Sequence, residues 1–445
     1  MTAIRNFIDQ WQLNAFRTMI EALAADLNAD LHAELWNGQT VALGQDARDD
    51  VRIVFRSPGV IRQLLMRPSL STLVDLYGTG AIDVTGAHLL DAIGRWDHIR
   101  ALKSLRKLSR PKLAGAALPF LFATPDTAPH SQAAAYGVEE VQATPETGRN
   151  DQDLIRFHYD VSNEFYALFL DPEMVYSSAY FETPETDLSE AQRAKLDMIC
   201  RRLRLRSGER LLDIGCGWGA LIAHAVQNYG VVAHGVTLSE RQLEFCKRKF
   251  EKLGISDRVT VELRDYRALP KDLVFDKIAQ IEMFEHLGLD NHDKHFETIH
   301  RLLRPRGLYL HQASVRRATP NLQDFRKTSP YMKFIRRHIF PGGDLDHIGM
   351  TLTNLERHGF EVHEVEGWRE HFQKTCAIWS RRLYEQRQEA AELVGPVRTR
   401  LWILYLVLAS ASFERTTIGV FQTLASKRRV GASGLPLTRK DLYDH

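Results

Sequence analysis

The spacing of apolar positions changes along the chain and divides it into segments. Residues 3–27 repeat at helical spacing, "VRIVF" (51–55) reads as a strand, and a helix is predicted over 59–66. These elements predict a small α+β domain over residues 1–113. From 114 to 150 the sequence is rich in Ala, Pro and Thr and has no periodicity, which is typical of a linker.

After residue 150 the patterns become regular. Helices are predicted over 153–170 and 189–205, and strands and helices then alternate through "RLLDIG", "GALIAHAVQNYG", "VVAHGVTL", "SERQLEFCKRKFEKLG", "VTVELRD", "FDKIAQIEMF", residues 291–303 and "GLYLHQASV". This alternation predicts an α/β fold with a doubly wound, Rossmann-like parallel sheet. The last third of the chain is predicted to be mostly helical and to belong to the same domain, residues 151–445.

The glycine turn is the first sign of chemistry. Residues 211–221 read "LLDIGCGWGAL", so a predicted strand leads into Gly215, Gly217 and Gly219. This spacing fits a dinucleotide loop or a loop around a smaller adenosyl ligand. A dinucleotide site also needs an acid at the end of the next strand to hold the ribose, but Thr237 and Ser239 occupy that place. S-adenosylmethionine, which has no pyrophosphate, fits better.

Two further positions agree with an adenosyl ligand. Asp213, just before the turn, can accept a hydrogen bond from the methionine ammonium group, directly or through water. Asp265 and Tyr266, at the end of the third strand, can bind and stack on adenine. The alternative is a tight strand–helix turn without a ligand, and the matching "RDY" turn at 264–266 weighs against it.

Other candidate residues allow two interpretations each. The aromatic-rich stretch 157–181 is either core or a lid that steadies a cation. Glu285 and His286 follow the fourth strand, where they either act at the site or begin a helix with a solvated histidine. His311 lies on the fifth strand among apolar residues. One predicted helix carries three histidines without metal-ligand spacing, so we predict surface positions and no metal for His292, His295 and His300.

Composition and charge limit the function classes. The chain has 445 residues, 44% hydrophobic and 26% charged, as in soluble proteins of two or three domains. A net charge of +2 predicts no nucleic-acid partner. The four cysteines form no C-x-x-C pair and suit a reducing compartment. No signal peptide is evident, and the most apolar run, 401–413, is shorter than the roughly 20 residues of a membrane span. We therefore expect a cytoplasmic protein.

A basic segment suggests where the protein acts. In residues 95–113 apolar side chains recur every third position, with basic side chains between them: Arg100, Lys103, Arg106, Lys107 and Arg110. Such an amphipathic helix is typical of binding to anionic phospholipid, although a solvated face is an equal alternative. We expect a peripheral protein on the inner face of the membrane.

Several motifs in fixed order resemble one family. They are "FHYDVSNEFYALFLD", "MVYSSAYF", "LLDIGCGWG", "GVTLSERQ", "EMFEHLG" and "FIRRHIFPGG". Together, over roughly residues 150–430, they resemble the cyclopropane-fatty-acyl-phospholipid synthases and the related mycolic acid methyltransferases. The first 113 residues more weakly resemble the small lipid-binding domain of bacterial synthases.

The resemblance implies methyl transfer from S-adenosylmethionine to a cis double bond in a phospholipid acyl chain, after which a bound bicarbonate removes a proton and the ring closes. It assigns Glu285 and His311 to the bicarbonate. It assigns the cofactor to Tyr176, Ser177, Gly215, Gly217, Thr237, Gln242, Tyr266 and Arg267.

The chain departs from the family pattern at positions around the base. Ser178 stands where the family has cysteine in "YSCAY", Phe372 matches a tyrosine that donates to bicarbonate, and Ala313 and Ala409 replace an isoleucine and a cysteine. A phenylalanine cannot donate, and a lost bond to a charged partner costs about 1.5–3 kcal/mol. Ring closure is therefore less well supported than methyl transfer.

Four functions remain after this comparison. The first is a cyclopropane synthase, and the second is a C-methyltransferase that gives methylene- or methyl-branched chains. A small-molecule methyltransferase would leave the basic segment unexplained. A lipid-binding module with a decayed site conflicts with the presence of the glycine turn, Glu285 and His311. The sequence leaves the oligomeric state open, a homodimer included.

Replacing Arg100, Lys103, Arg106 and Lys107 with glutamine should weaken binding to anionic vesicles, and more so at low salt, because each basic residue near such a surface contributes about 1 kcal/mol. Vesicle co-sedimentation at two salt concentrations measures this. Unchanged binding at low salt would exclude the proposed membrane role of this segment.

Overall fold

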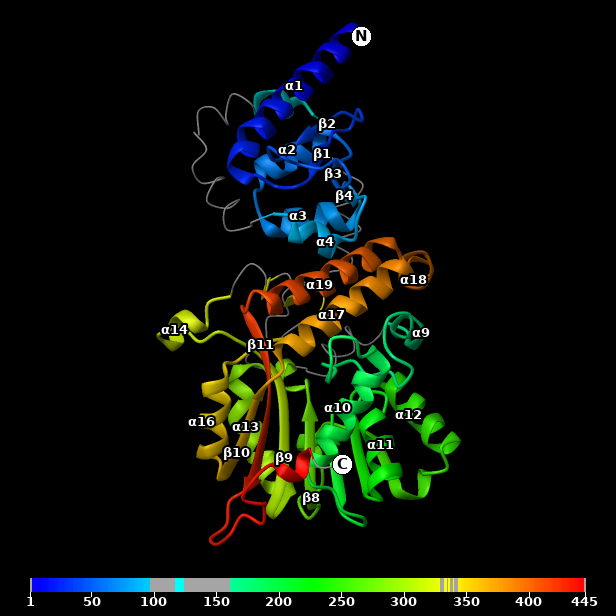
Figure 1. The fold of residues 1–445 in the computed structure, drawn as a ribbon, viewed down its shortest axis with the longest axis vertical. Coiled ribbons are helices and arrows are strands. Elements are labelled where there is room, and N and C mark those ends of the chain that lie inside the picture. The colour runs from blue at the N-terminus through cyan, green and yellow to red at the C-terminus, as the bar shows by residue number, and fades with distance from the viewer. Residues whose placement is uncertain are drawn as a thin grey trace. The chain divides into compact units, whose positions relative to one another are not determined.

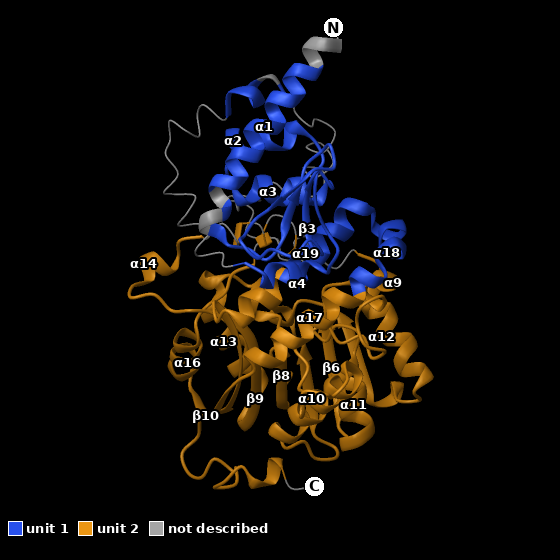
Figure 2. Cartoon of the chain, turned by 45° about the horizontal axis from the view of Figure 1, so that its top comes forward, with its two compact units in different colours: residues 1–138, 383–407 blue, residues 139–382, 408–445 orange. Residues whose placement is uncertain are grey.

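The computed structural model describes residues 2–96, 117–123, 161–328, 343–443 and, between 328 and 343, residues 332, 333, 335, 336 and 339. The chain forms two compact units, shown in Figure 2: unit 1 is residues 1–138 and 383–407, and unit 2 is residues 139–382 and 408–445. Most of the basic segment and of the predicted linker lies outside the described residues. The predicted domain boundaries at 113 and 150 therefore stay predictions.

Unit 1 contains a small α+β fold, as predicted for the start of the chain (Figure 1). Its sheet has the order β2-β1-β3-β4, in which β1 runs parallel to β3 and the other pairs are antiparallel. The elements of residues 1–138 are α1 (Thr2–Leu27), β1 (His32–Glu34), β2 (Thr40–Ala42), β3 (Arg52–Phe55), α2 (Pro58–Met66), α3 (Leu70–Gly78), β4 (Ile82–Thr85), α4 (Leu89–Gly94) and the 3-10 helix η1 (Leu118–Phe122).

Residues 383–407, which the sequence analysis placed in the second domain, pack within unit 1. They comprise the end of α17 (Arg369–Glu385), α18 (Arg387–Val394) and most of α19 (Pro396–Glu414). Leu401 lies against Gly78, where an added Cβ would come within 3.0 Å of its Cδ2 atom. Arg400 donates to the carbonyl oxygen of Tyr77, so apolar and polar contacts both fix α19 on α3.

Unit 2 carries the predicted alternation of strands and helices. Its remaining elements are α9 (Asn163–Ala167), α10 (Leu188–Arg202), β5 (Arg210–Ile214), α11 (Ala220–Tyr229), β6 (Val232–Thr237), α12 (Glu240–Lys252), η2 (Ser256–Arg258), β7 (Val259–Leu263), η3 (Tyr266–Ala268), β8 (Phe275–Ile281), η4 (Phe284–His286), η5 (Leu289–Asn291), α13 (His292–Leu302), β9 (Leu303–Arg316), α14 (Leu322–Phe325), α16 (Ile348–Arg357), β10 (Phe360–Gly367), β11 (Ile418–Lys427) and η6 (Lys440–Leu442).

The seven-stranded sheet has the order β10-β11-β9-β8-β5-β6-β7. Strands β5 to β9 are parallel, whereas β11 pairs antiparallel with both β9 and β10. The sheet is thus mixed, and the expectation of a mostly helical C-terminal third missed two strands. In β11 the polar side chains of Gln422 and Thr423 are buried, which interrupts the apolar pattern by which a buried strand is recognised.

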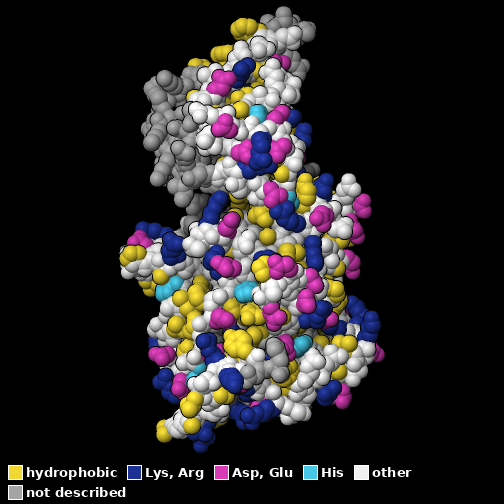
Figure 3. Space-filling view, viewed as in Figure 1, with side chains coloured by type: hydrophobic (Ala, Val, Ile, Leu, Met, Phe, Trp, Pro, Cys, Tyr) yellow, Lys and Arg dark blue, Asp and Glu magenta, His cyan; other side chains and the backbone are white. Residues whose placement is uncertain are grey.

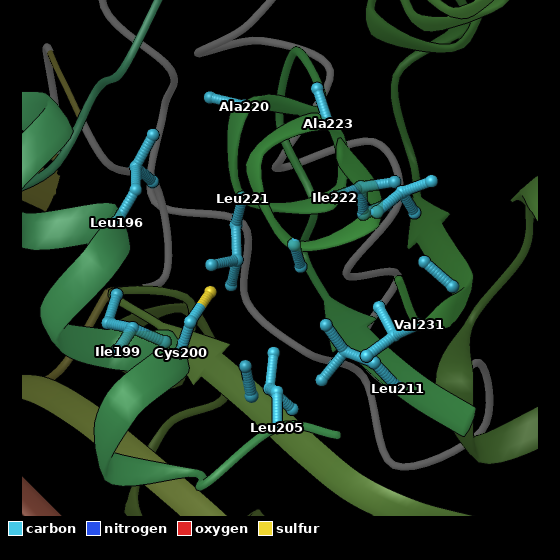
Figure 4. Packing of buried hydrophobic residues seen from close by; sticks show 14 of the residues in the cluster. Leu196, Ile199, Cys200, Leu205, Leu211, Ala220, Leu221, Ile222, Ala223 and Val231 are labelled. Carbon is cyan, nitrogen blue, oxygen red and sulfur yellow. The ribbon is translucent and has the colours of Figure 1, made fainter. Parts of the chain in front are cut away.

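Helices cover both faces of the sheet, and each face has its own apolar core. One core joins α10, α11 and α12 to the sheet, and the other joins α13 and α16 to the opposite face. Figure 4 shows the first core, in which Ile199 and Cys200 of α10 lie near Leu211 and Leu221. On the face shown in Figure 3, acidic and basic side chains are interspersed, in keeping with the small net charge. The buried layers hold the strand ends rigidly in place.

Replacing Gly219 with alanine should destabilise unit 2. Gly219 begins α11 with φ at +76°, and an added Cβ would lie 2.5 Å from the Phe250 ring of α12. We expect a loss of about 2–3 kcal/mol in the free energy of unfolding. Gly254→Ala is the control, because φ is +65° there but the space is open. Calorimetric unfolding should show the larger loss for Gly219, and equal losses would contradict the packing argument.

Candidate functional site

A pocket lies at the carboxyl ends of β5, β6, β7 and β8, where the strand order reverses between β5 and β8. Ligands of open α/β sheets bind at such a switch point. The lining includes ten of the residues predicted for the cofactor: Tyr176, Ser177, Asp213, Gly215, Gly217, Thr237, Gln242, Asp265, Tyr266 and Arg267. Gly219 is not among the lining residues, because it lies against Phe250 instead.

The glycine turn forms the floor of the pocket between β5 and α11. Gly215 and Gly217 have φ of +77° and +53°, a region that side chains with a Cβ resist. A Cβ at Gly215 would come within 3.0 Å of Met283, whereas one at Gly217 would meet no described atom within 4 Å. The turn therefore packs closely against the segment after β8 and leaves its other side open to a ligand.

Hydrogen bonds fix the polar walls over β6 and β7. The Thr237 hydroxyl donates to the side-chain oxygen of Gln242 at 2.7 Å. The Asp265 carboxylate accepts from the backbone N–H of Arg267 at 2.8 Å and pairs with its guanidinium group. Tyr266 directs its hydroxyl to Nδ1 of His295, at 2.8 Å. This end of the pocket thus presents acceptors and an aromatic wall to a ligand.

Charged side chains gather at the opposite end, near β5 and β8. Lys195 of α10 donates to the Ser177 hydroxyl at 2.8 Å, and burial lowers the pKa of Lys195 to about 8. Burial raises the pKa of Asp213 to about 7, and nearby Lys195 opposes the shift. Burial also raises the pKa of Glu282 to about 8. A cationic ligand would stabilise both carboxylates in their ionised forms.

Lys195 and Glu282 line the pocket but were missed by the sequence analysis. Lys195 lies on the apolar face of α10, among the buried residues Leu188, Ala191 and Ile199. A charged residue within an apolar stripe is the signal that could have marked it. Glu282 directly follows β8 with φ at +53°, and the sequence contains no sign of that backbone conformation.

The aromatic-rich stretch is mainly core, and residues 157–160 lie outside the described residues. Phe165, Tyr166 and Phe169 are fully buried and pack on one another. Among the described aromatics of this stretch, Tyr176 is the one that lines the pocket, with its ring centroid 5.2 Å from that of Trp379. Within the described residues the lid interpretation therefore applies to Tyr176, and for residues 157–160 it stays a prediction.

The predicted base residues lie near the ends of β8 and β9, outside the pocket lining. Glu285 accepts a hydrogen bond from the backbone N–H of Ser314 at 2.6 Å, and its Oε2 atom has no partner among the described residues. His311 is also buried, and its Nε2 atom likewise has no partner among the described residues. Its Nδ1 atom lies 3.0 Å from the Tyr309 hydroxyl. Burial raises the pKa of Glu285 to about 7 and lowers that of His311 to about 3. His311 is therefore neutral at physiological pH.

Two other positions matched to catalytic residues contribute little polar chemistry. Ser178 is buried and its hydroxyl donates to the backbone oxygen of Ala179, while its own N–H donates to Glu282. Phe372 packs on Phe413, with ring centroids 4.7 Å apart. Neither side chain offers a free donor to an anion.

The prediction of surface positions for the helix α13 histidines was wrong for two of them. His292 and His295 are buried, and His300 is half-buried. His295 lies between Tyr266 and Tyr309, whose hydroxyl groups are 2.8 and 3.0 Å from its two ring nitrogens. Burial holds the pKa of His295 well below its usual value, so the ring is a neutral part of the core.

Comparison with known proteins identifies the family to which the chain belongs. Residues 146–423 match the family model described as mycolic acid cyclopropane synthetase. A probable fatty acid methyltransferase of Pseudomonas putida is 34% identical over 418 residues, which are 94% of this chain and 97% of that protein. The structure of the cyclopropane synthase MmaA2 from Mycobacterium tuberculosis has 31% identity and a TM-score of 0.59, and the match covers 62% of this chain and 98% of that one. The structure of mycolic acid cyclopropane synthase CmaA1 complexed with SAH and CTAB has 33% sequence identity and a TM-score of 0.58, and the match covers the same shares of the two chains.

The fold and its glycine-turn pocket define an S-adenosylmethionine-dependent methyltransferase. Within that class, the chain belongs to the mycolic acid cyclopropane synthetase family.

The affinity for S-adenosylmethionine should rise between pH 6 and pH 8. Asp213 is protonated below its pKa of about 7, and the ligand's ammonium group favours the ionised form, so binding below pH 7 must expel a proton. We expect a rise of up to about tenfold per pH unit below pH 7. Calorimetric titrations of the wild type and of Asp213→Asn, which cannot ionise, should show a smaller pH dependence for the variant. Identical profiles would exclude Asp213 as the ammonium partner.

Proposed function

We propose that the enzyme transfers the methyl group of S-adenosylmethionine to the cis double bond of unsaturated phospholipid acyl chains and forms cyclopropane rings. The observation that carries the proposal is the pocket at the switch point of a chain that matches cyclopropane synthases over most of its length. The names of its relatives, a probable fatty acid methyltransferase and two cyclopropane synthases, support a lipid acceptor.

The chemistry requires little activation by the protein. The π electrons of the alkene form a bond to the methyl carbon as its bond to sulfur breaks, which releases S-adenosylhomocysteine and leaves a carbocation on the chain. Loss of one proton from the added methyl group closes the ring. Orientation of the alkene and exclusion of water are the main demands on the site.

Glu285 and His311 are our candidates for holding the group that takes the proton. Each has a buried polar atom without a partner among the described residues, Oε2 and Nε2. A bicarbonate ion would fit these two, because it can donate its O–H to a carboxylate and accept from an imidazole N–H. When bound, bicarbonate would supply the base. The protein's part would be to orient that ion and keep water away.

A second product is favoured by the surroundings of this base site. Phe372 is matched to a tyrosine that donates to the anion in the family, and its side chain packs on Phe413 instead. The Ser178 hydroxyl donates to the backbone oxygen of Ala179, so neither side chain gives the anion a hydrogen bond. A weakly held base would let the cation lose a proton from a neighbouring chain carbon instead, which gives a methyl-branched alkene. If a hydride first shifts from the methylated carbon to the cationic carbon, loss of a proton from the added methyl group gives a methylene-branched chain. A C-methyltransferase on the same lipids is therefore the alternative, ahead of a small-molecule methyltransferase.

The lipid would be reached from the membrane surface. Within the described part of the chain, no helix is both long and apolar enough to cross a bilayer. A peripheral enzyme at an anionic phospholipid surface, with the basic segment as its contact, is our proposal for the site of action.

Expression in a host with unsaturated phospholipids should add 14 mass units to monoene chains, the mass of one CH₂ group. The ring and the olefinic products weigh the same, so catalytic hydrogenation under mild conditions must separate them: a methylene-branched chain or a methyl-branched alkene gains two hydrogens and a ring does not. An olefinic product would replace the cyclopropane proposal by its alternative, and no mass change against an empty-vector strain would contradict both.

Glu285→Gln should abolish turnover and leave cofactor binding nearly unchanged, because the residue lies outside the pocket lining. In the wild type the rate should rise with pH through about 7, where the Glu285 carboxyl ionises and can accept a hydrogen bond from a bound acid. Initial rates on lipid vesicles measure the turnover and its pH dependence, and calorimetric titration with S-adenosylmethionine measures the cofactor binding. Equal losses of binding and turnover would assign Glu285 a structural role.

A further inference from the structure

A chain of buried amide side chains connects Arg202 of α10 to the pocket. The Arg202 guanidinium donates to the side-chain oxygen of Gln422 at 2.8 Å. The Gln422 amide nitrogen donates to the side-chain oxygen of Gln312 at 2.7 Å, and the Gln312 nitrogen donates to Oε1 of Glu282 at 2.5 Å. Arg202, Gln422 and Gln312 are each at least 98% buried. We call these three residues the relay.

The direction of the relay is fixed from one end. A guanidinium group can only donate, so Gln422 must turn its oxygen toward Arg202 and its nitrogen toward Gln312. Gln312 is then oriented in the same way and directs its N–H at Glu282. The group at the far end must accept, which a carboxylate does best. Chains of hydrogen bonds polarise one another, so the arginine charge acts on Glu282 through two amides.

The remaining contacts of Arg202 and Glu282 agree with this direction. Arg202 is paired with Glu366 and lies over the Trp368 ring, so its charge is kept in the core. Oε1 of Glu282 also accepts from the backbone N–H of Ser178 at 3.0 Å. The backbone of Glu282 has φ at +53°, a costly conformation for a residue with a side chain, and such strain gathers at functional sites.

Glu282 lies at the end of the pocket where the cofactor's sulfur would be. Our assignment puts adenine over β7, beside Asp265 and Tyr266, so the methionine part extends toward β5 and β8. There Asp213 can pair with the ammonium group, and Glu282 is the other acid that lines this end, since Asp265 lies at the adenine end. The other charged groups at this end are Lys195, which donates to Ser177, and Glu285, which does not line the pocket.

We propose that Glu282 is the counter-ion of the cofactor's sulfonium group, and that Arg202, Gln422 and Gln312 are positioning residues that hold the Glu282 carboxyl group in place and favour its ionised form when the cofactor binds. The inference rests on the proposed orientation of the cofactor. It predicts a preference that no structural role would produce. S-adenosylmethionine carries the sulfonium charge and S-adenosylhomocysteine does not, whereas the rest of the two molecules is the same.

The test is the affinity of Glu282→Gln for the two compounds, measured by calorimetry without lipid. We expect the affinity for S-adenosylmethionine to fall about tenfold or more and that for S-adenosylhomocysteine to fall less than about threefold. Equal losses, or no loss, would overturn the proposal. Glu282→Asp keeps the charge and should restore much of the preference, and an aspartate variant as poor as the glutamine variant would also overturn it.

The relay is tested by Gln422→Met, a replacement of similar size without an amide. We expect the same selective loss, about threefold, for S-adenosylmethionine. Gln12→Met is the matched control, because Gln12 is a buried glutamine of unit 1, none of whose described residues line the pocket. If the affinities of Gln422→Met for the two compounds equal those of the control variant, the proposed positioning role of the relay is wrong. Because no lipid is present, these outcomes are independent of whether the acyl-chain proposal holds.

Discussion

The parallel pairing of β5 with β8 is the constraint on which the site depends. The two strands are in register from Leu211 opposite Lys277 to Ile214 opposite Gln280, so both end at the same edge of the sheet. The glycine turn and the segment after β8, which begins with Glu282, therefore leave the sheet side by side, so close that a Cβ added at Gly215 would lie 3.0 Å from Met283. A change of register by one residue would turn Asp213 to the wrong face and separate the turn from Glu282.

The pocket is also unusual in its electrostatics. Two carboxyl groups and one amine lie at its β5–β8 end, and burial disfavours the charged form of each. Without compensation such groups become neutral, which costs less than isolated buried charges. A ligand with two positive groups and one negative group supplies the missing partners. The protein thus keeps these ionisable groups in reserve for the bound cofactor, and the affinity for the ligand includes the free energy of restoring their charges.

The sequence predicted the local features of this site and missed the long-range ones. Strand ends and the turn are short-range patterns, so Asp213, Gly217, Thr237 and Tyr266 could be placed from the sequence, and they line the pocket. The buried environment of His295 could not be predicted from the sequence, because the sheet brings its hydrogen-bond partners Tyr266 and Tyr309 to it. Gln312, Gln422 and Glu282 escaped notice for the same reason, since polar residues read as exposed until their partners are known. Strand ends also marked Glu285 and His311 as candidates, whereas their role in holding bicarbonate came from the family resemblance.

The late position of β11 in the chain has a consequence for biosynthesis. Gln422 lies 220 residues after Arg202 and 110 after Gln312, yet β11 sits between β9 and β10 inside the sheet. A nascent chain that has completed β5 to β9 would leave β9 as an open edge, with unpaired backbone groups. The ribosome must release the chain through β11, which ends at Lys427, before that edge is covered. Until then the exposed edge of β9 is a site for wrong pairing, against which chaperones protect a nascent chain, and the pocket matures only after β11 has been synthesised.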